Sequence, residues 1–249
     1  MRLFRSEWTK FRSLRSTWLT AAVTVLLGVG ISALASAGQA REYTGEDWDP
    51  TAVSLTSLLV SQLAIGVLGV LVITAEYATG TIQPSMIAAP RRGRFLAAKA
   101  AVLAFAAVLL GQLIGFASFF AGQAMIAGVG VPHATLGQPD VLRAVVGSGL
   151  YLAVIGLLGL GLGTVLRSTA GAIGALVSIT LLVRAVAQAL PEAWATWMDR
   201  YWPTAAGARI TAVLSEPGAL GPWAGFAILC GFVAVVCAAG YTVLRAKDA

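Results

Sequence analysis

"TAVSLTSLLVSQLAIGVLGVLVITA" (residues 51–75) contains no aspartate, glutamate, lysine or arginine. An α-helix that rises about 1.5 Å per residue needs roughly 20 apolar residues to cross the roughly 30 Å hydrocarbon core of a bilayer, and this stretch is longer. Its apolar character is continuous and does not alternate as the wall of a membrane β-barrel does. The stretch therefore predicts a membrane-spanning helix and indicates that the protein is embedded in lipid.

Similar apolar runs recur along the whole chain. Of its 249 residues, 58% are hydrophobic and 11% are charged, whereas a soluble domain carries roughly 25% charged residues. We therefore predict an all-α membrane protein with one transmembrane domain over residues 1–249. Its six spans are predicted near residues 17–37, 52–75, 100–128, 144–166, 171–190 and 223–244.

The positive charges indicate how these spans are oriented. If both termini lie in the cytoplasm, lysine and arginine concentrate in the segments on that side and are sparse on the other. Because these residues favour cytoplasmic helix ends, both termini are predicted to be cytoplasmic. The net charge of +6 is then a topology signal and not a sign of nucleic-acid binding. The predicted cytoplasmic segments are residues 1–16, 76–99, 167–170 and 245–249.

The first 16 residues are predicted to form an amphipathic helix on the cytoplasmic membrane surface. On a 3.6-residue period the apolar side chains fall on one arc, so basic residues could face anionic lipids while aromatic rings enter the acyl chains. Two alternatives are a plain positively charged anchor and a signal peptide cleaved near "ALASA" (residues 33–37). The apolar arc consists of Leu3, Phe4, Trp8, Phe11, Leu14 and Trp18.

Several function classes lack the side chains that they need. The single histidine, His133, falls in a predicted outer loop, and Glu76 is the one carboxylate at the edge of a span. Catalysis by acid, base, metal or nucleophile is therefore not expected, nor is proton-coupled transport. No lysine has the setting of a phosphate-binding loop, so any ATP hydrolysis must occur on another chain. The chain is predicted not to be an enzyme and to hold no cofactor or metal.

Arg184 is the one charge inside a predicted span. It either snorkels to the outer interface or faces a polar pathway, where it would meet an anionic part of a cargo. In the second case glutamine side chains would accompany it. They are Gln188 one turn later, and Gln62, Gln112 and Gln123 from other spans.

The outer segment 191–221 is rich in aromatic residues. Tryptophan and tyrosine favour the headgroup level of a bilayer, so the segment is predicted to lie on the outer interface or to dip into it. Its aromatic side chains form either a structural belt or an external gate over a pathway. They are Trp194, Trp197, Tyr201 and Trp202.

The fourth predicted span contains the glycine-rich run "GLLGLGLG" (residues 156–163). Gly159 and Gly163 have the four-residue spacing that lets two helix backbones approach closely. One interpretation of this spacing is packing within the chain, and the other is contact with a second copy.

A polar stretch, "ITAEYATGTIQPSMIAAPRRGRFLAAK" (residues 73–99), joins the second and third spans. Its arginines place it in the cytoplasm, and it is too long for a minimal turn. Such a stretch can carry a short helix of its own, for which Pro84 is allowed near the start. A partly apolar cytoplasmic elbow of this kind suits docking onto a protein partner.

Together with "SEWTKFRSLRSTW" (residues 6–18), this stretch resembles the type-2 ATP-binding cassette (ABC) transporter permeases of bacteria. Many of these begin with a basic and aromatic Glu-x-x-Lys segment and carry Glu-Tyr-x-x-Gly-Thr-Ile, followed by Pro-x-Arg, after the second span. The specific motifs cover a small part of the chain, while the six-span layout covers all of it. Gln83 departs from the family pattern, since relatives often have a basic residue there.

The resemblance implies a permease of the bacterial plasma membrane that pairs with a second copy or a paralogue. It also implies two ABC ATP-binding subunits, which would hold ATP and Mg²⁺, and short re-entrant helices in segment 191–221. The residues that match the motif for coupling to the ATPase are Glu76, Tyr77, Gly80, Thr81, Pro90 and Arg91. Those that match the N-terminal interface are Glu7, Lys10 and Phe11.

Glu76 lies where the helix dipole disfavours a carboxylate, so we expect it to have a basic partner. The candidates are N-terminal arginines and an arginine of the ATPase, although the carboxylate could also serve only to stabilise the fold. The function predicted from the sequence is the permease subunit of an ABC exporter that works by alternating access. The alternatives are a membrane protein that binds or regulates a partner without transport and, less favoured, an ion-coupled carrier.

Overall fold

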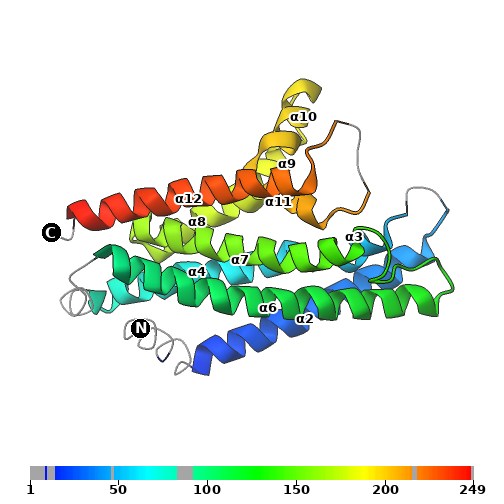
Figure 1. The fold of residues 1–249 in the computed structure, drawn as a ribbon, viewed down its shortest axis with the longest axis horizontal. Helices are drawn as coiled ribbons and strands as arrows, with labels where there is room; N and C mark the ends of the chain where they lie inside the picture. Colours follow the sequence, from blue (N-terminus) through cyan, green and yellow to red (C-terminus); the bar gives the residue numbers. More distant parts are fainter. Residues whose placement is uncertain (1–8, 10–14, 46–47, 83–91, 215–217, 248–249) are drawn as a thin grey trace.

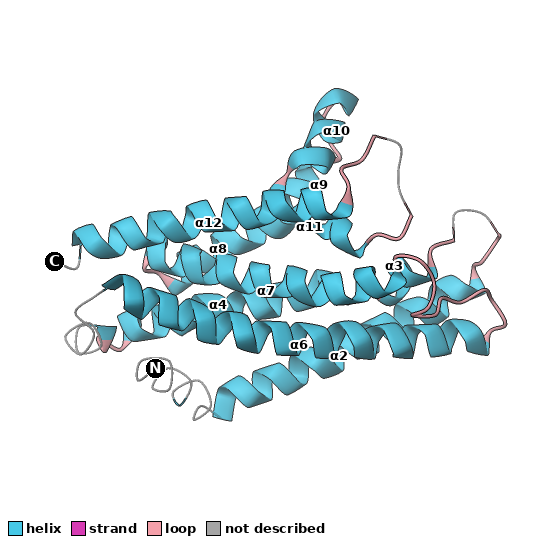
Figure 2. Ribbon diagram, viewed as in Figure 1, coloured by secondary structure: helices cyan, strands magenta, loops and turns pink. Residues whose placement is uncertain are grey.

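Every regular element in the described part of the chain is helical (Figures 1 and 2). The computed structural model describes residues 9, 15–45, 48–82, 92–214 and 218–247. The longer helices lie roughly side by side along one direction (Figure 1). They are α2 (Arg15–Arg41), α4 (Leu58–Ala78), α6 (Arg92–Gly128), α7 (Val141–Leu166) and α12 (Pro222–Lys247). The shorter elements are α3 (Pro50–Ser54), α8 (Thr169–Val177), the π-helical turn η1 (Ser178–Leu182), α9 (Val183–Ala187), α10 (Glu192–Tyr201), α11 (Pro203–Ala208) and the 3₁₀ turn η2 (Arg209–Thr211).

Six helices among the described residues are long and apolar enough to cross a membrane, which confirms the predicted number of spans and the all-α fold. The fifth span is composite, because α8, η1 and α9 follow one another without a break over Thr169–Ala187. The second span is preceded by α3, whose N-terminus is capped by the side chain of Asp49. Aspartate favours this position because its oxygen accepts hydrogen bonds from free backbone N–H groups.

The predicted loop 76–99 is wrong in its bounds, because α4 continues to Ala78 and α6 begins at Arg92. The third span was predicted to begin at residue 100, directly after the positive charge of Lys99. Basic residues are nevertheless good helix formers, and a helix can continue past the hydrocarbon into the cytoplasmic headgroup layer. With 37 residues α6 is about 55 Å long, far more than the hydrocarbon requires.

Helix α7 is the centre of the bundle (Figure 1). Its span is 78% buried, against 22% for the spans that contain α8 and α12. It packs against α4, α6 and α12, and its side chains Leu152, Ile155 and Leu158 are fully buried in the largest apolar cluster. A helix that is apolar on all sides belongs in such an interior position.

Glycines bring the backbones of α4 and α7 together. A Cβ atom added to Gly159 would overlap the carbonyl oxygen of Gly66, and one added to Gly69 would overlap that of Gly156. A Cβ at Gly163 would crowd Ile73, also on α4. The interpretation that Gly159 and Gly163 serve packing within the chain is therefore confirmed.

The outer segment divides into two parts. Helix α10 has no buried residue and stands away from the bundle (Figure 1). The elements after it, α11 and η2, pack back against α12 and α7 and bury Ala205, Ala206 and Ile210. Arg143 on α7 fixes this return, since its guanidinium donates hydrogen bonds to the carbonyls of Ile210 (2.8 Å) and Ala212 (2.9 Å).

Candidate functional site

A buried ion pair joins the C-terminal end of α4 to the N-terminal part of α6, on the side predicted to be cytoplasmic. The Nζ atom of Lys99 lies 2.7 Å from Oε1 of Glu76, and their side chains are 2% and 12% exposed. The ammonium also donates to the carbonyl of Val72 (3.4 Å) and lies 5.1 Å from the ring centroid of Phe95. Lys99 is thus a basic partner of Glu76 within the chain itself.

This pairing explains how two charges are tolerated between two helices. Removing a charge from water costs several kcal/mol unless an opposite charge and hydrogen bonds compensate it. Glu76 lies in the last turn of α4, where the helix dipole is unfavourable to it, and the ammonium of Lys99 offsets both effects. The N-terminal arginines considered as partners lie outside the described residues.

The residues of the coupling motif that follow Glu76 end helix α4. Ala78 is its last residue and Thr79 caps it, while Gly80 has a φ of 69°, a left-handed conformation that glycine adopts without strain. The hydroxyls of Thr79 and Thr81 lie 2.9 Å apart and close the turn. The other predicted contact residues, Glu7, Lys10, Phe11, Pro90 and Arg91, lie outside the described residues.

Two arginines extend the contacts to the other spans at this end of the bundle. The guanidinium of Arg167, at the end of α7, lies 5.4 Å from the ring centroid of Tyr77 and donates to the carbonyl of Val243 on α12 (3.4 Å). Arg92, at the start of α6, donates to the carbonyls of Leu244 (3.1 Å) and Arg245 (2.9 Å). Their contacts join the ends of α4, α6, α7 and α12, and we call Lys99, Arg167 and Arg92 the cytoplasmic cation network after the side of the membrane predicted for them.

These contacts were not predicted from the sequence, in which the charges of Lys99 and Arg92 indicate only the orientation of the chain. One signal was present, since Glu76 and Lys99 flank the same connection between two consecutive spans. Opposite charges at the facing ends of neighbouring antiparallel helices are close in space, which favours their pairing.

The three glutamines assigned to a pathway make interhelical contacts. Gln62 accepts a hydrogen bond from the hydroxyl of Tyr151 (2.8 Å), and the amide of Gln112 donates to the carbonyl of Val146 (2.9 Å). Gln123 donates to the carbonyl of Pro50 (2.8 Å) and accepts from the backbone of Ala134 (2.7 Å). None of these hydrogen bonds involves Arg184.

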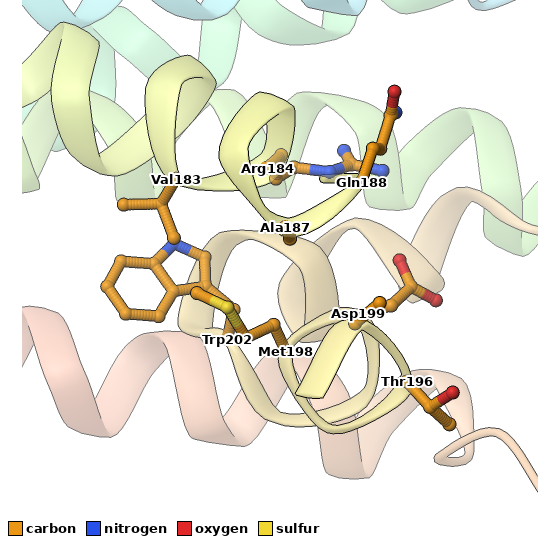
Figure 3. Close-up of a pocket in the computed structure, with 9 residues that line it drawn as sticks. Val183, Arg184, Ala187, Gln188, Thr196, Met198, Asp199 and Trp202 are labelled. Atoms are coloured by element: carbon orange, nitrogen blue, oxygen red, sulfur yellow. The ribbon is translucent and has the colours of Figure 1, made fainter. Parts of the chain in front are cut away.

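Arg184 and Gln188 line a cavity of about 340 Å³ between α9 and α10 (Figure 3). They are four residues apart and so lie on one face of the helix end. The full lining is Val183, Arg184, Ala187, Gln188, Ala195, Thr196, Met198, Asp199 and Trp202. Arg184 and Gln188 are thus near each other as predicted, and the cavity that they line is completed by residues of α10 and by Trp202.

The four aromatic residues of the outer segment have different environments. Trp194, Trp197 and Tyr201 on α10 are 63%, 53% and 39% exposed, as expected for side chains at a membrane interface. Trp202 differs, because its indole N–H donates to the carbonyl of Ile179 (2.9 Å). That carbonyl lies in the π-helical turn η1, a type of turn that often marks functional sites in membrane and soluble helices.

Taken together, the six long apolar helices define a multi-pass α-helical membrane protein. The family model described as "ABC-2 family transporter protein" matches residues 3–187, and the chain belongs to this family. The comparison with curated proteins gives no match. The family implied by the sequence motifs is thereby confirmed.

Membership of this family gives the chain a transport role as a membrane subunit that is not itself an enzyme. It also implies an ABC ATP-binding partner in general. Among the residues that the structure describes, no group of three or more His, Cys, Asp or Glu side chains could hold a metal ion.

Proposed function

We propose that the chain is the transmembrane permease subunit of an ABC exporter in a bacterial plasma membrane, with both termini in the cytoplasm. Residues 1–249 form one permease domain that pairs with a second copy or a paralogue. ATP and Mg²⁺ bind to separate ATP-binding subunits, whose closure drives alternating access of the spans. The observation that carries this proposal is the buried ion pair between Glu76 and Lys99.

The ion pair makes the ends of α4 and α6 move as one unit. It lies on the helices that enter and leave segment 79–91, which carries most of the motif for coupling to the ATPase. A displacement of this segment by a partner acts on both helices, because separating them would strand two buried charges. The uninterrupted α6 then transmits the displacement over about 55 Å to the outer side.

The cytoplasmic cation network spreads the same displacement to two further spans. Arg92 holds the end of α12 to the start of α6, and Arg167 joins Tyr77 to α12. Guanidinium groups suit this task because their several donors reach backbone carbonyls of a neighbouring helix end. The ATPase contact consists of Glu76, Tyr77, Gly80, Thr81, Pro90 and Arg91, together with Glu7, Lys10 and Phe11 of the N-terminal amphipathic helix.

At the outer end, α10 and the cavity beside it form the exit side of the pathway. Arg184 and Gln188 meet the cargo there, and Trp194, Trp197 and Tyr201 form the outer gate. Support comes from the position of α10, which has no buried residue and packs mainly against α9 and α11, so its motion breaks few contacts besides the ion pair of Asp199 with Arg209. Motion of an element with few buried contacts requires little free energy.

The experiment is to purify the tagged chain in mild detergent from its own host and to identify the proteins that co-purify. We expect a stoichiometric ATPase subunit, and an ATP hydrolysis rate of the complex that changes on reconstitution into lipid. Glu76→Gln and Lys99→Met should each lower this rate at least tenfold while the chain still inserts into the membrane. The matched control is Glu192→Gln, which removes an exposed carboxylate at the outer end.

Two results would contradict the proposal. If no ATPase co-purifies under conditions that preserve other membrane complexes, a membrane protein that binds or regulates a partner becomes the better interpretation. If purified permease transports a cargo without any ATPase, the ion-coupled carrier does.

A further inference from the structure

The cavity between α9 and α10 has one polar end and one apolar end (Figure 3). Gln188, Asp199 and Thr196 are drawn at one end, and Val183 and Trp202 at the other (Figure 3). The cavity volume of about 340 Å³ is at the lower end of the roughly 300–1,000 Å³ of small-molecule sites. It can hold a headgroup-sized moiety with a short apolar part.

The polar end carries an uncompensated positive charge. Asp199 is paired with Arg209 at 2.7 Å, so its negative charge is already compensated. The guanidinium of Arg184, by contrast, makes no hydrogen bond and no ion pair with any residue in the part of the chain that the structure describes. Arg184 also belongs to the fifth span, where an arginine is costly unless it meets water or an anion.

We infer that this cavity binds the anionic group of an amphiphile, a phosphate or a carboxylate. Arg184 is the counter-ion, since a guanidinium offers two parallel N–H donors that match the oxygens of either group. Val183, Met198 and Trp202 contact the apolar part, whereas Gln188 and Thr196 lie at opposite edges of the polar end (Figure 3).

The place of the cavity in the fold fits such a ligand. It lies at the outer end of the fifth span, beside the exposed tryptophans of α10, which is the level where headgroups lie. The anionic group can belong to a lipid of the bilayer or to an amphiphilic cargo that leaves by this route. The role as a cargo site rests on the proposed transport function, whereas the binding itself requires no ATPase.

The test is native mass spectrometry of the purified full chain, without ATPase, titrated with phosphatidylglycerol and with phosphatidylcholine. We expect phosphatidylglycerol to bind at least tenfold more tightly, the factor that a charge-assisted hydrogen bond supplies. Arg184→Gln should reduce the preference to about twofold or less, and Arg184→Lys should retain most of it. Arg200→Gln is the control, because Arg200 is exposed on α10 and does not line the cavity.

A second variant guards against loss of folding. Asp199→Asn removes the carboxylate that offsets the charge of Arg209 at the polar end, so the local charge becomes more positive and phosphatidylglycerol binding should strengthen about two- to fivefold. A misfolded variant cannot produce a gain. A preference that is the same in Arg184→Gln as in the unchanged chain, or an Asp199→Asn variant that binds more weakly, overturns the inference.

Competition by free glycerol 3-phosphate distinguishes the two sources of the anion. Displacement of the lipid shows that the anionic group alone suffices, as for a water-soluble end of a cargo. Lack of displacement shows that the intact amphiphile is required. In both cases dependence on Arg184 supports the inference. If the inference about the cavity fails, an ATPase can still co-purify with the chain, so the binding site and the transport function are tested separately.

Discussion

At the scale of single residues, Glu76 and Lys99 form a buried ion pair within the otherwise apolar packing of α4 and α6. A carboxylate and an ammonium that are both buried cannot be justified by stability alone, because apolar side chains of the same volume are often as stable. A pair of this kind ties two helices in one register, which is useful where a partner acts on the connection between them. Its retention at the edge of segment 79–91 therefore agrees with the proposed coupling role.

Removing one member of this pair should destabilise the chain more than removing both. Lys99→Met leaves the carboxylate of Glu76 buried without its ammonium and should cost about 3–5 kcal/mol. The double variant Glu76→Leu with Lys99→Met should recover most of that loss, because no charge is left in the interior. Thermal unfolding in detergent measures both. Additive losses in the double variant would show that the two charges are not energetically coupled.

At the scale of elements, the glycines of α4 and α7 show what a sequence can and cannot predict. The spans follow from continuous apolarity, and close packing follows from the spacing of Gly159 and Gly163. The partner of that packing does not follow, because any helix with small residues would fit. The same limit applies to Lys99 and Arg92, whose charges predicted topology while their contacts depend on which helix ends meet.

Adding a methyl group at Gly159 should loosen the bundle. Gly159→Ala would press its Cβ against the carbonyl of Gly66, a backbone atom that cannot move aside, and should cost about 1–3 kcal/mol despite the higher helix propensity of alanine. Gly174→Ala on α8 is the matched control, because its Cβ would have open space. Thermal unfolding in detergent compares them, and equal stability of the two variants would contradict the close contact of α4 with α7.

The hydrogen bond from Trp202 should hold the outer segment to the fifth span. Trp202→Phe keeps an aromatic ring but loses the N–H that the carbonyl of Ile179 accepts, which should cost about 0.5–1.5 kcal/mol. Hydrogen exchange of the amides of α11 should then accelerate several-fold. Trp194→Phe, at a side chain that is 63% exposed, should leave this exchange unchanged. Identical exchange in both variants would mean that apolar packing alone holds the segment.

At the scale of the whole molecule, the two ends of the bundle are built differently. The end predicted to be cytoplasmic joins four spans through the cytoplasmic cation network and the carboxylate of Glu76 that pairs with Lys99. The outer end carries α10, which has no buried residue, and the cavity that contains Arg184. A tightly joined end suits the input of force from a partner, and a loosely attached end suits release of a cargo, which is the division of labour that alternating access requires.

This division depends on the orientation of the chain, which positive charges predict and cysteine labelling can measure. Cys230 and Cys237 lie within the last span, so a membrane-impermeant maleimide should leave the unchanged chain unlabelled in intact cells. Thr196→Cys, exposed on α10, should then be labelled from outside, whereas Thr79→Cys, equally exposed, should be labelled only after the membrane is opened. The opposite pattern would invert the topology and place the cation network outside the cell. In that case segment 79–91 could not receive force from a cytoplasmic ATPase, and Arg184 could not lie at an outer exit, because the two sides of the membrane would be exchanged.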